Sequence, residues 1–74
     1  MDKRFLLERL SIMRGKAEAA HLEVVVQTSL VTQAKTAGRS DIAAEARLRS
    51  LIMHEQKLLR ELNWILDQLD RMER

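Results

Sequence analysis

Two apolar stripes, one on each side of a short polar break, constrain the fold of this chain most strongly. The break lies at residues 36–41, and each stripe advances by alternating steps of three and four residues. The first stripe comprises Leu6, Leu10, Met13, Ala17, Ala20, Val24, Gln27, Val31 and Ala34. The second comprises Ala44, Leu48, Leu51, Glu55, Leu58, Leu62, Ile65, Leu69 and Met72. Such spacing puts each stripe along one side of an α-helix.

Folding the chain back at Gly38 brings the two stripes together, and we call them jointly the seam. Leu6 then falls opposite Met72 and Leu10 opposite Leu69, and the match continues up to the break. The sequence therefore predicts an all-α fold, an antiparallel helical hairpin of two long amphipathic helices. We expect residues 1–74 to form this single domain.

Local signals set the expected helix bounds. Asp2 suits the capping position of a first helix over residues 2–35, and Gly38 suits the left-handed residue that ends a helix. Ser40 or Asp41 suits the cap of a second helix over residues 41–72. The turn is therefore expected at residues 36–41.

Composition excludes several classes of protein. The chain has 74 residues with no cysteine, which removes disulfides and thiolate metal sites and is consistent with a reducing cytosol. The apolar run at residues 5–7 is cut at once by Glu8 and Arg9, so it is too short for a signal core or a membrane span. We expect a cytoplasmic protein.

Charge gives little sign of a nucleic-acid partner. Thirteen Lys and Arg residues stand against eleven Asp and Glu residues, with the two signs interspersed along both helices. Single-stranded nucleic acids are bound by clustered basic residues with aromatic platforms, and Phe5 and Trp64 are the only aromatic residues. The pattern is typical of a solvated outer surface.

No catalytic, cofactor-binding or metal-binding residue is predicted. The serines have no histidine and acid arranged to activate them, and an elongated hairpin lacks the concave pocket of a small-molecule substrate. His21 and His54 fall near each other along the rod, but no two histidines stand at metal-binding spacing within one helix. Gln27 and Glu55 interrupt the seam, and polar residues at such positions commonly fix helix register.

A second apolar row beside the seam predicts a partner. In the second helix the row is Ile52, Leu59 and Leu66, with Met53 and Trp64 further round; in the first it is Phe5, Ile12, Ala19 and Val26. Soluble monomers rarely leave contiguous apolar patches of this size exposed. We therefore expect the hairpin to be completed by a partner or a second copy. The predicted partner-binding residues are Ile12, Val26, Ile52, Leu59, Trp64 and Leu66.

The leucine-rich segment at residues 56–69, together with the size of the chain and its lack of cysteine and proline, resembles a known family. It is similar to the small co-chaperones of the type III secretion needle protein, the group typified by YscE and PscE. The resemblance implies a protein that pairs with a tetratricopeptide-like chaperone, and that the pair keeps the needle subunit monomeric in the cytoplasm until export.

Self-association is the alternative function class. Two hairpins could pack their second rows together into an antiparallel four-helix bundle, acting as an RNA-binding regulator or a structural adaptor. RNA binding would then depend on surface residues such as Arg14, Lys16, Arg47 and Arg49. Phosphate contacts are strongly screened, so salt-dependent RNA retention would favour this alternative.

Overall fold

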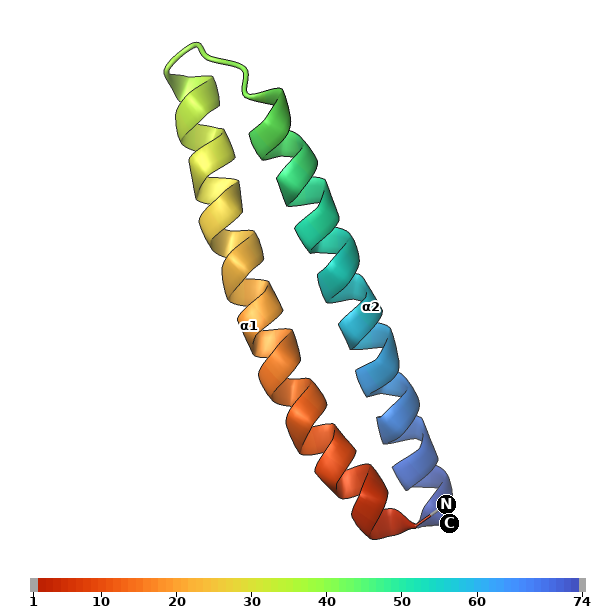
Figure 1. Ribbon diagram of the computed structural model, residues 1–74. Coiled ribbons are helices and arrows are strands. Elements are labelled where there is room, and N and C mark those ends of the chain that lie inside the picture. Colours follow the sequence, from red (N-terminus) through yellow and green to blue (C-terminus); the bar gives the residue numbers. More distant parts are fainter. Residues whose placement is uncertain (1, 74) are drawn as a thin grey trace.

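The computed structural model describes residues 2–73 and consists of two helices joined by one turn. Helix α1 spans Lys3–Thr36 and helix α2 spans Ile42–Met72. The helices run side by side in opposite directions, so both ends of the described chain meet at one end of a rod measuring 55 × 16 × 14 Å (Figure 1). The prediction of an all-α helical hairpin is confirmed.

Capping side chains and one glycine determine where the helices begin and end. Asp2 Oδ1 accepts a hydrogen bond from the Arg4 backbone N–H, and Asp41 Oδ1 accepts one from the Ala44 N–H, each at 3.0 Å. Of the two caps considered for α2, Asp41 is therefore the one used. Gly38 has a φ of 73°, a conformation that glycine adopts without steric cost, and it turns the chain out of α1.

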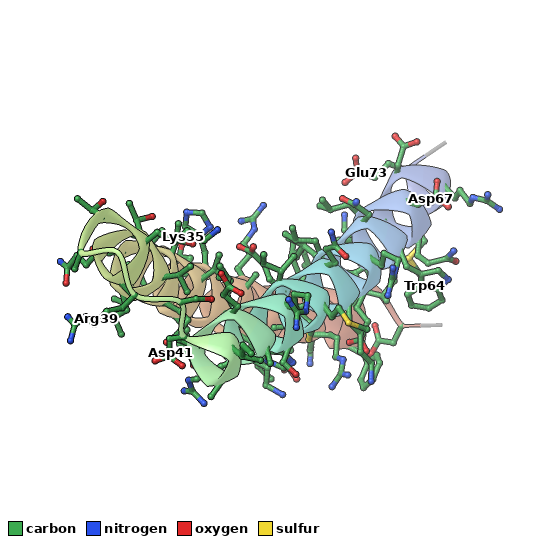
Figure 2. The ribbon with its side chains drawn as sticks, turned by 90° about the horizontal axis from the view of Figure 1, so that it is seen from above. Lys35, Arg39, Asp41, Trp64, Asp67 and Glu73 are labelled. Atoms are coloured by element: carbon green, nitrogen blue, oxygen red, sulfur yellow. The ribbon has the colours of Figure 1, made fainter. Side chains whose placement is uncertain are left out.

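The buried core follows the seam and is concentrated toward the open end of the hairpin. The buried apolar cluster comprises Leu6, Leu10, Met13, Ala17, Ala20, Leu58, Ile65 and Leu69, with Leu62 packed against it. Toward the turn, Gln27 and Val31 are buried, while Leu48 and Leu51 are half-buried. The two helices are inclined to each other, as expected when stripes of this period pack together (Figure 2).

The predicted pairing along the seam is wrong in the middle and toward the open end of the hairpin. Leu6 was placed opposite Met72, but Leu6 and Ile65 border the same hollow, and Met72 is 43% exposed. Glu55 was placed opposite Val24, but its Oε2 atom meets His21 Nδ1 at 2.8 Å. The contacts thus lie about two turns from the predicted pairing at Leu6 and about one turn at Glu55, while the ion pair of Lys35 with Glu45 near the turn keeps close to it. The physical reason is that a side chain in such a seam packs into a hole between residues of the facing helix, not against one opposite residue.

Candidate partner-binding surfaces

Large apolar side chains remain exposed over much of the hairpin. Within residues 2–73 there are thirteen of them: Phe5, Leu7, Ile12, Leu22, Val25, Val26, Leu30, Ile42, Met53, Leu59, Trp64, Leu66 and Met72. Five of the six predicted partner-binding residues are in this set, each between 39% and 60% exposed. The sixth, Ile52, is half-buried beside the seam.

The six predicted residues lie on two opposite faces of the hairpin. Leu59 and Trp64 are five residues apart, which is roughly 140° around α2 at 3.6 residues per turn. Leu59 borders a hollow with His21 and Glu55, whereas Trp64 borders one with Arg9 and Glu61. These two hollows lie on either side of the line where the helices meet.

We name the faces after one residue on each. The His21 face carries Leu7, His21, Val25, Ile52, Leu59 and Leu66, and the Trp64 face carries Phe5, Ile12, Val26, Leu30 and Trp64. Residues seven apart share a row on a helix in such a seam, which assigns Ile12 to the row of Phe5 and Leu66 to the row of Leu59. The sequence suggested that the second apolar rows of the two helices form one patch. In the structure the two rows lie on different faces of the hairpin.

The Trp64 face contains an apolar hollow near the open end. Its lining is Phe5, Leu6, Arg9, Glu61, Trp64 and Ile65, and its volume is about 240 Å³. The Trp64 side chain stands out from α2 (Figure 2). The sequence placed Trp64 over Met13 and Arg14, but the register shift places it beside the first turns of α1. That shift is also why the pairing with Phe5 was missed.

An ion pair crosses the same hollow. Arg9 and Glu61 approach to 3.6 Å, with both side chains close to half exposed. Exposed pairs of this kind add little to stability, so the carboxylate and guanidinium remain available to polar groups of a partner. An apolar hollow with aromatic walls and a charged rim is suited to an apolar side chain presented by another helix.

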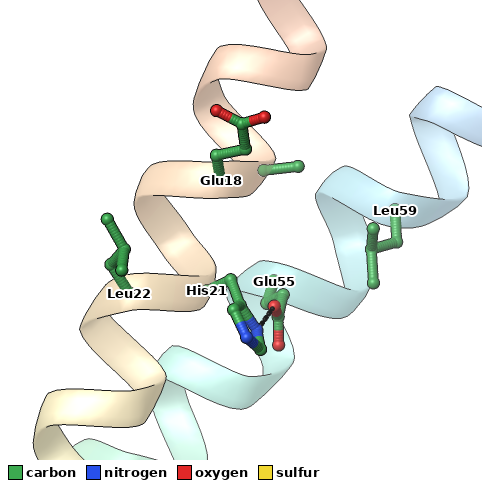
Figure 3. Close-up of a pocket in the computed structure, with 6 residues that line it drawn as sticks. Glu18, His21, Leu22, Glu55 and Leu59 are labelled. Atoms are coloured by element: carbon green, nitrogen blue, oxygen red, sulfur yellow. Dashed lines mark hydrogen bonds and ion pairs between the residues drawn. The ribbon is translucent and has the colours of Figure 1, made fainter.

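The His21 face contains a wider, more open hollow in the middle of the rod (Figure 3). It is lined by Ala17, Glu18, His21, Leu22, Glu55 and Leu59, and its volume is about 560 Å³. Because the side chain of Ala17 is small, the surface has a depression between the helices at this point. The hollow therefore lies directly beside Leu59.

The two polar residues of the seam both have partners on the opposite helix. Glu55, whose side chain is only 16% exposed, meets the more exposed His21. Gln27 is 7% exposed, and its Nε2 atom donates a hydrogen bond at 3.0 Å to the Ala44 carbonyl oxygen. These contacts are compatible with the predicted role in fixing register. The sequence placed Glu55 near His21 only as one acid of a candidate metal site with His54, and not as the partner of His21 in an ion pair.

The four basic residues considered for RNA binding are divided between the faces. Arg14 lies seven residues before His21 and Arg49 three before Ile52, which assigns both to the His21 face. Arg47 borders a hollow with Val26, and Lys16 lies seven residues after Arg9, which assigns both to the Trp64 face. They do not line one groove.

The part of the chain that the structure describes shows neither a metal centre nor a membrane-spanning helix. Within residues 2–73 no group of three or more His, Cys, Asp or Glu side chains is placed so that it could hold a metal ion. Neither α1 nor α2 combines the length and apolar character of a membrane-crossing helix.

Comparisons with family models, with curated proteins and with solved structures return no match to this chain.

Proposed function

We propose that this protein is a non-enzymatic protein-protein interaction module, and specifically a small cytoplasmic co-chaperone. In this proposal it docks on a helical-repeat chaperone and helps to keep a type III secretion needle subunit soluble and unpolymerised. The observation that carries the proposal is the Trp64 hollow, in which an exposed tryptophan stands beside Phe5 over the buried floor formed by Leu6 and Ile65.

The side chains that line the two hollows favour the binding of a protein partner rather than catalysis. The Trp64 hollow offers one guanidinium and one carboxylate, which already pair with each other. The His21 hollow offers a histidine and two carboxylates on an open apolar surface, and among residues 2–73 no hydroxyl or lysine side chain lines either hollow. An acid-base pair without a nucleophile or an enclosed substrate site does not form a catalytic constellation.

The shape of the protein suits a helical-repeat partner. Repeat proteins present long concave surfaces built from stacked helix pairs, and a straight hairpin can lie along such a surface with one face in contact. Tryptophan is enriched at interface positions that contribute most of the binding energy. We therefore place the main contact on Trp64, with Phe5, Ile12 and Val26 along the same face.

Trp64→Ala is expected to weaken binding to the chaperone by at least about tenfold, because it removes the side chain that would anchor the interface. The measurement is isothermal titration of the purified variant into the helical-repeat chaperone from the same genome. Met53→Ala is the matched control, since Met53 is an exposed apolar residue of α2 outside both faces. Its binding should equal that of the wild type.

Two results would contradict the proposal. One is the absence of any binding of the wild-type protein to the chaperone, with or without the needle subunit. The other is binding that Trp64→Ala and Phe5→Ala both leave unchanged, which would exclude the Trp64 face as the contact.

A further inference from the structure

The solvent-accessible surface of the hairpin is larger than that of a compact monomer of the same mass. The chain exposes 5708 Å² for a mass of 8.6 kDa. Compact monomers of this mass expose about 4,700 Å², so each chain has an excess of about 1,000 Å². A standard protein interface covers about 800 Å² on each partner. One partner packed along the length of the rod would thus bring the exposed area to the ordinary range.

The apolar row of α2 on the His21 face is symmetric about Leu59. Ile52 lies seven residues before Leu59 and Leu66 lies seven residues after it. A second α2 laid antiparallel on this row, with a twofold axis at Leu59, would bring each Leu59 against the other. Ile52 of each copy would then meet Leu66 of the other. The row is therefore self-complementary in size and polarity.

The neighbouring row of α2 has a basic residue at one end and an acidic residue at the other, and its midpoint lies close to Leu59. It consists of Arg49, Gln56, Asn63 and Asp70, each seven residues from the next. In the antiparallel arrangement Arg49 meets Asp70 of the second copy, and Gln56 meets Asn63. In a parallel twofold arrangement the two copies of this row would lie on opposite sides of the contact, so Arg49 and Asp70 would not meet. The charges thus select the antiparallel arrangement.

The rest of the His21 face is compatible with this packing. The same symmetry brings Glu45 near Glu73 of the second copy, but each already pairs with a lysine of its own chain, Lys35 and Lys3, at 3.5 Å. Two acids and two lysines would therefore meet there. The hollow beside Leu59, with Ala17 in its lining, offers room for Leu59 of the second copy.

We propose that the His21 face binds a second copy of this chain and forms a twofold-symmetric, antiparallel four-helix assembly. The contact is isologous, so the same rows of α2 serve both copies. The Trp64 face remains open on the outside of the dimer. The proposal does not depend on the chaperone, because it rests on the His21 face alone.

A single cysteine tests the position of the twofold axis, since the natural chain has none. Leu59→Cys should form a disulfide-linked dimer rapidly on mild oxidation, because the two residues at the axis come within the short range that a disulfide needs. Trp64→Cys, on the opposite face of the same helix, is the matched control and should remain mostly unlinked. Equal linking of both variants, or linking of Trp64→Cys alone, would overturn the proposal.

Charge reversal tests the antiparallel register. Sedimentation equilibrium should give a dimer for the wild type and a several-fold weaker dimer for Arg49→Glu and for Asp70→Arg. The double variant restores the opposite charges and should recover most of the wild-type affinity. A wild-type protein that stays monomeric at all accessible concentrations, or a double variant weaker than both singles, would refute the proposal. Chaperone binding measured on the same samples tests the Trp64 face separately.

Discussion

Ile65→Asp is expected to leave the chain largely unfolded at neutral pH, whereas the neighbouring Trp64→Asp should keep its helices. Ile65 is 3% exposed in the core, and Trp64 is 50% exposed on the surface. The first substitution removes about 1.5 to 3 kcal/mol of apolar burial and adds several kcal/mol for burying a carboxylate. A core of this size rarely supplies more than about 3 to 5 kcal/mol in total.

Circular dichroism of the two variants at matched concentration is the measurement. Loss of helical signal in Ile65→Asp together with its retention in Trp64→Asp would support the assignment of the two side chains. Retained helicity in both, with cooperative thermal unfolding, would mean that Ile65 is not in the core. Trp64→Asp should also lose chaperone binding without losing structure, which separates the surface role of Trp64 from a role in folding.

Met13→Ala is expected to lower the free energy of unfolding by about 2 to 5 kcal/mol, since truncating a buried Met leaves a cavity as well as losing apolar burial. Met13 is 1% exposed, while Met53, a residue of the same type on the other helix, is 68% exposed. Met53→Ala should therefore change stability by less than about 0.5 kcal/mol.

Urea unfolding of both variants and the wild type checks this prediction. The protein concentration must be equal in all samples, because self-association would add to the apparent stability. Similar losses for the two methionines would contradict the observed core. A smaller loss for Met13→Ala than for Met53→Ala would place the buried side of α1 elsewhere.

Much of the fold was predictable because the relevant signals are local. The alternating three and four spacing identifies the buried side of each helix from residues close in sequence. Asp2, Gly38 and Asp41 mark the helix ends through capping and through a left-handed backbone, which depend on a few neighbouring residues. The observed bounds of α1 and α2 consequently agree with the expected ones to within one residue.

The register and the division into two faces were not predictable in the same way. A shift of one or two turns between the helices preserves every local pattern, so the mirror symmetry of the stripes does not decide it. The side chains of Phe5 and Trp64, and those of His21 and Glu55, meet only once that shift is known. Leu59 and Trp64 were predicted to share one surface, but five residues of helix separate them by roughly 140° around α2.

The separation of the faces has a functional consequence. A single apolar surface could serve either a second copy or a chaperone, so the two sequence hypotheses excluded each other. With two faces the protein could use both at once: Leu59 at a dimer axis and Trp64 outside it. A complex that contains two copies of this chain and two chaperones would follow directly from that arrangement.

The distance between spin labels at positions 16 and 57 shows whether the chain folds back at Gly38 within one molecule. Both side chains are exposed on the Trp64 side, and the chain has no natural cysteine to interfere. With labelled protein diluted in unlabelled protein, the hairpin predicts a distance of about 20 Å, set by helix axes 8 to 10 Å apart and the label arms. A distance of about 60 Å, as in one continuous helix at 1.5 Å per residue, would mean that the chain does not fold back on itself.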